Sequence, residues 1–171
     1  MRVADRIFEI LKEKVSCIYF VPGGSSMYLV DALGLSGIRH VSCMHEQGAG
    51  FAAIGHAMVE GFGVCLTSAG PSATNAVTAC AAAWTDSVPV LFISGQARTD
   101  TLVQNTRLRT RGAQEIDIIP MVKPITKESY QPMSGGIDCI MALEHMIKEC
   151  KSGRPGPCWL SIPQDVSGIE L

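Results

Sequence analysis

The chain has 171 residues, of which 47% are apolar and 18% charged, and its formal net charge is −2. This composition fits one globular domain with its own core and excludes an intrinsically disordered chain. No block of Lys and Arg could follow a phosphate backbone, and no apolar run could span a bilayer. Neither nucleic acid nor a membrane is therefore expected as a partner.

Seven cysteines are scattered through mostly apolar segments, with no CxxC pair. They are interpreted as small, reduced core residues. A zinc site needs ligands in a short array, so no metal is expected to bind to this chain alone. The N-terminal "MRVADRIFEILKEK" is an amphipathic helix pattern rather than a signal peptide, which predicts a cytoplasmic protein.

The first half of the chain alternates helical and strand-like patterns. Its strand-like runs are 17–21, 38–44 and 64–68, and its helical patterns are 2–14, 27–37 and 46–60. The segment from Glu46 to Glu60 is rich in Ala, Gly and Met. This predicts a helix with a closely packed face that ends at Gly61.

The second half continues the alternation. It predicts a helix over 76–87, a strand over 88–94, a polar stretch without clear pattern over 95–134, a helix over 136–153 and a strand over 156–163. Continuous apolar strands between helices indicate a doubly wound α/β fold, with a mainly parallel sheet and helices on both faces. Residues 1–171 are expected to form this single domain.

Ligands in such folds bind beyond the carboxyl ends of the strands. The stretches expected there are "PGGSS", "MHEQGAG", "SAGPSATN" and "SGQART". Glu46 begins a helix at this edge, where a solvated carboxylate favoured by the helix dipole is the simplest interpretation. However, Met44 and "GAGFAA" around it look buried, and an unpaired buried carboxylate should have a raised pKa suited to proton transfer.

Three familiar motifs are excluded or poorly supported. "GAGFAA" fits a dinucleotide fingerprint, but the strand after it ends "LTSAG" without the acidic residue that would hold a ribose. His45 and Glu46 begin H-E-x-x-H, but Ala49 occupies the position of the second His. No G-x-S-x-G elbow of a serine hydrolase is present.

Five ordered motifs carry a family resemblance: "FVPGGS", "HEQGAGFAAIGHAMVEG", "GVCLTSAGPSATNAVTACAAAWTDSVPVLFISGQ", "GAQEIDIIPMVKPITK" and "GRPGPCWLSIPQDV". Together, over about residues 5–166, they resemble the N-terminal pyrimidine-binding (PYR) domain of thiamine diphosphate enzymes, especially the acetolactate synthase group. The resemblance implies that Glu46 bonds N1′ of the cofactor's aminopyrimidine ring and so helps the cofactor lose its C2 proton.

The same resemblance implies further cofactor-binding residues. Pro71 would contact the ring, although a proline there is also good helix-start chemistry. Asn75 would be a polar contact or a helix-start residue. Val21, Pro22 and Gly23 would bring backbone close to the cofactor or an opposing subunit, although a plain strand-to-helix turn explains them equally well.

Gln114 matches a catalytic glutamine that, in acetolactate synthase-like enzymes, points toward the reacting centre. Ala113 stands where those enzymes commonly carry Phe, so the acceptor substrate stays open. Decarboxylation, carboligation or both remain possible on a 2-oxo acid, and so do a sulfopyruvate- or phosphonopyruvate-type decarboxylase and a non-catalytic interaction subunit. The nearby arginines could meet an anionic substrate or a neighbouring subunit, but a solvated loop is the simpler interpretation.

The family's diphosphate-binding domain carries Gly-Asp-Gly and a later Asn, which hold Mg²⁺ and through it the diphosphate. No Gly-Asp-Gly occurs in these residues. The resemblance therefore implies a diphosphate-binding partner, on a separate chain of a split enzyme or in the rest of a longer protein, within a homo- or hetero-oligomer. The middle domain that binds FAD in acetolactate synthase has no counterpart here, so flavin is not expected.

Overall fold

A computed structural model describes residues 1–103, 106–133 and 135–171. The strands of these residues form one sheet in the order β2-β1-β3-β4-β6-β5, and every neighbouring pair is parallel. The strands are β1 Cys17–Phe20, β2 Arg39–Ser42, β3 Gly63–Thr67, β4 Val90–Gln96, β5 Glu128–Tyr130 and β6 Cys158–Pro163. The predicted α/β class with a parallel sheet is confirmed.

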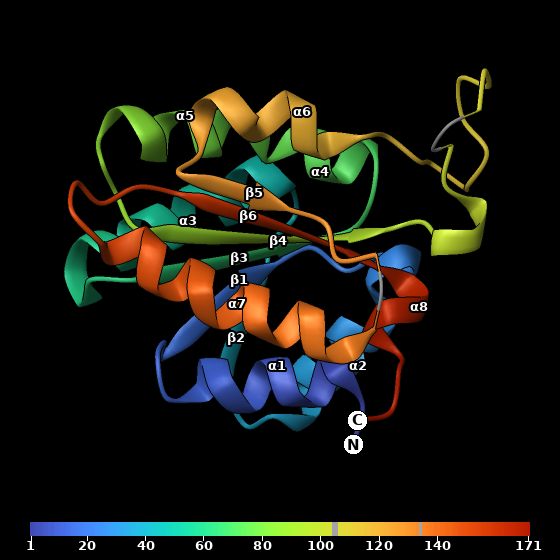
Figure 1. Ribbon diagram of the computed structural model, residues 1–171. Coiled ribbons are helices and arrows are strands. Elements are labelled where there is room, and N and C mark those ends of the chain that lie inside the picture. The colour runs from blue at the N-terminus through green and yellow to red at the C-terminus, as the bar shows by residue number, and fades with distance from the viewer. Residues whose placement is uncertain (104–105, 134) are drawn as a thin grey trace.

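Helices cover both faces of the sheet (Figure 1). They are α1 Val3–Lys12, α2 Met27–Leu35, α3 Glu46–Glu60, α4 Pro71–Asn75, α5 Val77–Thr85, α6 Ile118–Val122, α7 Gly136–Lys151 and α8 Gln164–Ser167. Short 3₁₀ turns occur at η1 Gly24–Ser26, η2 Thr99–Thr101 and η3 Lys123–Ile125. Buried residues of α1, α2, α7 and α8 form one apolar cluster with the sheet, and those of α3, α4, α5 and α6 form the other.

The second cluster is built largely from small residues, which lets α3 lie very close to α5. A Cβ placed on Gly50 of α3 would fall 2.5 Å from the Cβ of Ala79 in α5, so only glycine fits there. Beneath the helices, the rings of Phe92 and Trp159 stack with 5.2 Å between their centroids. The closely packed face predicted for the helix from Glu46 to Glu60 is confirmed at Gly50.

Two parts of the chain differ from expectation. The polar stretch 95–134 contains α6 and the edge strand β5, whose three residues were too few to give a periodic signal; its positions 104, 105 and 134 lie outside the described residues. Strand β2 is exposed along all four residues because it forms the other edge of the sheet.

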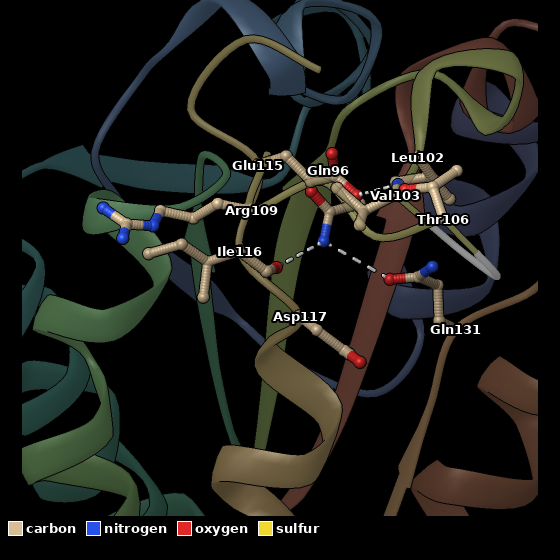
Figure 2. A pocket seen from close by; sticks show the side chains of 9 residues that line it. All are labelled: Gln96, Leu102, Val103, Thr106, Arg109, Glu115, Ile116, Asp117 and Gln131. Carbon is tan, nitrogen blue, oxygen red and sulfur yellow. Dashed lines mark hydrogen bonds between the residues drawn. The ribbon is translucent and has the colours of Figure 1, made fainter. Parts of the chain in front are cut away.

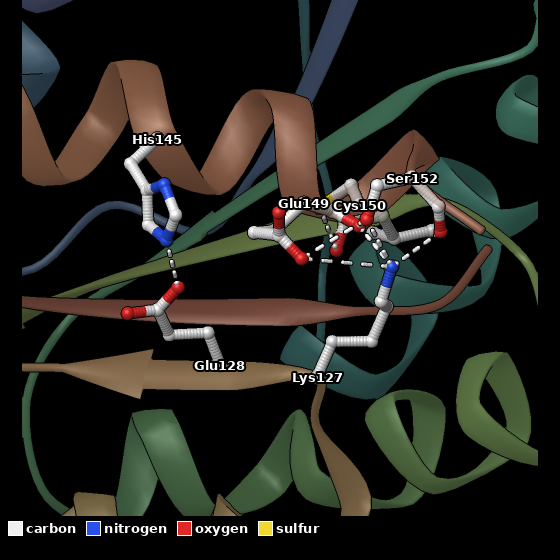
Figure 3. A network of polar contacts seen from close by, with 7 residues as sticks. Lys127, Glu128, His145, Glu149, Cys150 and Ser152 are labelled. Carbon is white, nitrogen blue, oxygen red and sulfur yellow. Dashed lines mark hydrogen bonds and ion pairs between the residues drawn. The ribbon is translucent and has the colours of Figure 1, made fainter. Parts of the chain in front are cut away.

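Lys127 fastens the end of α7 to the sheet (Figure 3). Its ammonium group donates hydrogen bonds to the carbonyl oxygen of Glu149 and to the carbonyl and hydroxyl oxygens of Ser152. One residue further, Glu128 of β5 pairs with His145 of α7 at 2.7 Å. Both contacts join β5 and its approach to the same helix.

The two ends of the described chain meet beside α8 (Figure 1). The backbone N–H of Val3 donates to the carbonyl of Ile169 at 2.8 Å, and that of Leu171 donates to the carbonyl of Met1 at 2.9 Å. All seven cysteines are free thiols, as the sequence predicts. Among the described residues, no helix has both the length and the apolar character needed to cross a bilayer.

Candidate functional site

The candidate site lies at the carboxyl edge of the sheet, where α3 and α4 begin. Glu46 is the first residue of α3, which follows β2, and Pro71 is the first residue of α4, which follows β3. Because β1 lies between β2 and β3, both helices start next to the loop that leaves β1. The sheet order thus gathers three of the four stretches that the sequence placed at this edge.

Asn75 is the residue that α4 brings to Glu46. Its side-chain Nδ2 donates a hydrogen bond to Oε2 of Glu46 at 2.9 Å, although the two residues are 29 positions apart. Asn75 is the last residue of α4, so its interpretation as a helix-start residue is wrong. The expected start of a helix at Pro71 is confirmed.

The surroundings of the Glu46 carboxyl group favour its ionised form. The residue is only 9% exposed, and burial raises its pKa. Hydrogen bonds from Asn75, from its own backbone N–H and from Ser72 outweigh burial, and His45 adds a smaller attraction, so the pKa is lowered from its usual 4.5. The predicted raised pKa is therefore wrong, because the sequence pattern could not show that α4 supplies donors.

The neighbours of Glu46 in the sequence are buried only in part. Met44 is fully exposed, so the expectation that it is buried is wrong. In "GAGFAA", Ala49, Gly50 and Ala53 are buried as expected, whereas Phe51 is 44% exposed. His45 is exposed as well and serves as the N-cap of α3, where its Nδ1 accepts the backbone N–H of Gln47 at 3.1 Å. The side-chain contacts of the carboxylate come from α4, through Asn75 and Ser72.

The loop that follows β1 and the loop that follows β3 are in contact at Gly23 and Ser68. A Cβ on Gly23 would fall 2.4 Å from the Cβ of Ser68, so the glycine allows a close approach between two loops of the same chain. The backbone N–H of Ser68 donates to the hydroxyl of Ser72, and Val21 donates its N–H to the carbonyl of Leu66. The stretch from Val21 to Gly23 is thereby fixed beside the start of α4.

The loop that carries Gln114 contacts the start of α4. Gly70, the N-cap of α4, has φ 58° and ψ −122°, a conformation open to glycine. A Cβ on Gly70 would fall 1.8 Å from the carbonyl oxygen of Gln114, so the two backbones are in contact. Gln114 is exposed, and no hydrogen bond joins it to Glu46 among the described residues.

The predicted site residues thus divide into one buried acid and an open surface around it. Pro22, Pro71, Asn75 and Gln114 are exposed, and Val21 and Gly23 are half-buried. Sequence reasoning missed Ser72, which lies between the predicted Pro71 and Asn75 and bonds both Ser68 and Glu46. A hydroxyl one position after a helix-initial proline was the available signal.

A separate cavity of about 240 Å³ lies beyond the ends of β4 and β5 (Figure 2). Gln96 of β4 donates from Nε2 to the carbonyl of Ile116 at 2.8 Å and to Oε1 of Gln131 at 3.4 Å. Glu115 and Arg109 also line it, whereas none of the predicted site residues does. The cavity is therefore distinct from the Glu46 site, although Glu115 directly follows Gln114.

Comparison with known proteins gives a consistent result. Residues 1–121 match the family described as thiamine pyrophosphate enzyme, N-terminal TPP binding domain. The chain is 41% identical to the acetolactate synthase large subunit of Corynebacterium glutamicum over 174 residues, covering 100% of this chain and 27% of that protein.

Similar relatives occur in other organisms. The acetolactate synthase isozyme 2 large subunit of Escherichia coli is 41% identical, with 89% of this chain and 27% of the relative covered. The chloroplastic acetolactate synthase 2 of Nicotiana tabacum is 38% identical, with 95% and 24% covered. The chain spans about a quarter of the length of these curated relatives.

Proposed function

The chain belongs to the thiamine pyrophosphate enzyme family, as its N-terminal TPP binding domain, and on that basis we propose that it is the pyrimidine-binding part of a thiamine diphosphate-dependent enzyme acting on a 2-oxo acid. The proposed reaction is acetolactate synthase-like: decarboxylation, carboligation or both. When bound, thiamine diphosphate supplies a thiazolium carbon that adds to the carbonyl group of the 2-oxo acid and accepts the electron pair left when CO₂ departs.

The observation that carries the proposal is the carboxylate of Glu46, held at the carboxyl edge of a parallel sheet and opened toward an exposed rim. Each carboxylate oxygen has two lone pairs, and Asn75 uses one of those on Oε2. Acceptor capacity thus remains for a protonated ring nitrogen. Glu46 would hold that proton at N1′ of the aminopyrimidine, and a ring covering the carboxylate would raise its pKa toward that of the nitrogen.

The surrounding residues fit a flat heteroaromatic ring. Pro71 offers an apolar surface at the head of α4, and Asn75 keeps Glu46 oriented. Val21, Pro22 and Gly23 would supply backbone beside the ring. Gln114 would extend from the neighbouring loop toward the reacting centre.

The diphosphate and its Mg²⁺ would be held by another domain. The described residues contain no group of three His, Cys, Asp or Glu side chains arranged to hold a metal ion. We propose that this PYR domain, residues 1–171, works with a diphosphate-binding domain, on a partner subunit or in a longer chain, within a homo- or hetero-oligomer. Seven free cysteines support a cytoplasmic, reducing location.

The test is Glu46→Gln in the protein assembled with its diphosphate-binding domain. An amide cannot act as an anionic partner of a protonated ring nitrogen, so turnover of pyruvate, followed by CO₂ release, should fall by about 10²- to 10⁴-fold. Exchange of the cofactor's C2 proton with solvent should slow in parallel. Incubation with a panel of 2-oxo acids, with products identified by mass spectrometry, would define the substrate.

Glu60→Gln is the matched control, because Glu60 ends the same helix and its carboxylate also accepts a side-chain hydrogen bond, from Ser16 at 2.6 Å. It should leave turnover close to that of the wild type. Normal turnover in Glu46→Gln would remove Glu46 from the mechanism. Absence of thiamine diphosphate binding in the assembled protein would instead favour a non-catalytic subunit.

A further inference from the structure

The carboxylate of Glu115 accepts hydrogen bonds from both ends of the segment from Val103 to Gly112. Oε1 of Glu115 accepts the backbone N–H of Val103 at 2.6 Å, and Oε2 accepts those of Arg111 and Gly112 at 3.1 and 3.0 Å. Figure 2 shows the Glu115 side chain reaching across to Val103. Hydrogen bonds to a charged acceptor are stronger than neutral ones, so this attachment holds the two ends of the segment together.

The turn that contains Glu115 is itself seated on the sheet. A Cβ on Gly112 would fall 2.4 Å from the Cβ of Ala97, the residue after β4, so the turn packs directly against the end of that strand. On the other side, the Gln96 amide donates to the carbonyl of Ile116 at 2.8 Å. The turn from 112 to 116 is therefore held at the carboxyl end of β4 by contacts with Gln96 and Ala97.

Gln114 occupies this turn in a conformation that it would not adopt freely. Its φ of 55° lies in the left-handed region, which is uncommon for a residue with a side chain. Its carbonyl oxygen presses against Gly70, and Glu115 follows it directly. Such a conformation persists where the surroundings hold it, and here the Glu115 attachment and the contact with Gly70 do so.

We propose that Glu115 is a positioning residue for Gln114: by holding the N–H groups of Val103, Arg111 and Gly112, it fixes the turn that aims Gln114 at the site of Glu46. This inference rests on the proposed function, in which Gln114 acts near the reacting centre. The consequence is a backbone connection, from Glu115 through Gln114 to Gly70, that ends at the helix carrying Asn75.

The attachment is tested by hydrogen exchange in the assembled protein carrying Glu115→Gln. The glutamine keeps one acceptor oxygen but places an NH₂ group against backbone donors. Amides of Val103, Arg111 and Gly112 should exchange faster, on the order of tenfold. Asp117→Asn is the matched control, because Asp117 is an exposed carboxylate two positions on that accepts no hydrogen bond from the described residues.

The positioning role is tested by a double-mutant cycle on kcat. Glu115→Gln should lower kcat by about tenfold through misplacement of Gln114, with the Kd of thiamine diphosphate unchanged. In a Gln114→Ala background the same substitution should have no further effect on kcat. A merely structural role would lower kcat equally in both backgrounds.

Each other outcome overturns a definite statement. Unchanged exchange in Glu115→Gln would overturn the attachment, and an undiminished loss of kcat in the Gln114→Ala background would overturn the positioning role. Normal kcat in Gln114→Ala would overturn the action through Gln114. Failure of the proposed function itself is recognised separately, because Glu46→Gln would then also keep normal turnover.

Discussion

The pKa of Glu46 is lowered most by a side chain that comes from another helix, Asn75 of α4. Burial raises the pKa of Glu46, and the hydrogen bond from Asn75 is the largest of the contributions that lower it. If that donor were lost while the burial stayed, only the backbone N–H of Glu46, Ser72 and His45 would still oppose the effect of burial on the pKa. The pKa of such a carboxylate is sensitive to any group that covers it.

Asn75→Ala should therefore raise the pKa of Glu46, because burial continues to oppose the charge after the donor is removed. In the wild type a lowered folded-state pKa stabilises the fold above the ordinary value of 4.5, and this stabilisation is lost as the pH falls through the folded-state pKa. In the variant, the contribution of Glu46 to the stability of the fold should be smaller, and it should be lost at a higher pH than in the wild type. The pKa would be followed by ¹³C NMR of the Glu46 carboxyl carbon, assigned with Glu46→Gln.

Thr74→Ala provides the control, since Thr74 lies next to Asn75 and its hydroxyl bonds the carbonyl of Pro71 rather than Glu46. Its substitution should leave the Glu46 titration in place. An unchanged pKa in Asn75→Ala would show that the Asn75 hydrogen bond does not govern the charge.

Sequence reasoning at the residue scale succeeded where a signal was local. The start of a helix at Glu46 and its end at Gly61 follow from neighbouring residues, and Gly61 does adopt a left-handed φ of 83°. The pKa of Glu46 was predicted in the wrong direction, because its donors Asn75 and Ser72 come from a helix that only the tertiary fold places nearby. The roles of Gln114 and the other cofactor contacts stay predictions.

At the scale of elements, α7 shows how a helix end can be fixed by a side chain from outside the helix. The last carbonyl groups of a helix have no partner within it and carry partial negative charge. Lys127, which immediately precedes β5, supplies an ammonium group to the carbonyl oxygens of Glu149 and Ser152. Its side chain is only 18% exposed, so water cannot readily replace it.

Lys127→Met should lower the free energy of unfolding by about 1–3 kcal/mol, because it leaves the partly buried carbonyl group of Glu149 without its charged donor. The effect would be measured by urea denaturation. Lys148→Met is the matched control: Lys148 lies in the last turn of α7 but is exposed. Equal losses in both variants would mean that general attraction to the helix end, rather than the specific contacts of Lys127, stabilises α7.

The elements that the sequence missed share a physical cause. Strand β5 has three residues, and α6 has five, so neither is long enough to establish a period. β5 exists because it pairs with β6 along the edge of the sheet and because Lys127 and Glu128 tie its start to α7. Short elements of this kind owe their form to tertiary contacts rather than to local pattern.

For the whole molecule, the alternation of apolar strands and helices was enough to predict a parallel α/β sheet. It could not give the strand order, because β5 lies at the edge, one position away from β4, and β6 later fills the position between them. The order matters for function, since β1 between β2 and β3 is what brings the starts of α3 and α4 together.

Cofactor binding is expected to require the assembled molecule. With thiamine diphosphate at a hundred times its Kd and Mg²⁺ present, this chain combined with its diphosphate-binding domain should gain about 2.7 kcal/mol of stability. The isolated domain should gain far less, because in the proposed function its residues would contact only the pyrimidine side of the cofactor. Thermal unfolding with and without cofactor would measure both, with Mg²⁺ alone as the control. Equal stabilisation of the isolated domain would contradict the division of the site.

The meeting of the two chain ends has a consequence for topology. Met1 and Leu171 are joined by a backbone hydrogen bond, and Val3 is joined to Ile169 in the same way. A short peptide could therefore link the ends, and new ends could be opened at the exposed turn around Gly153, between α7 and β6. Such circular permutation would reorder these 171 residues along the chain while leaving each strand in its place, and the same proximity suits the domain to insertion within another polypeptide.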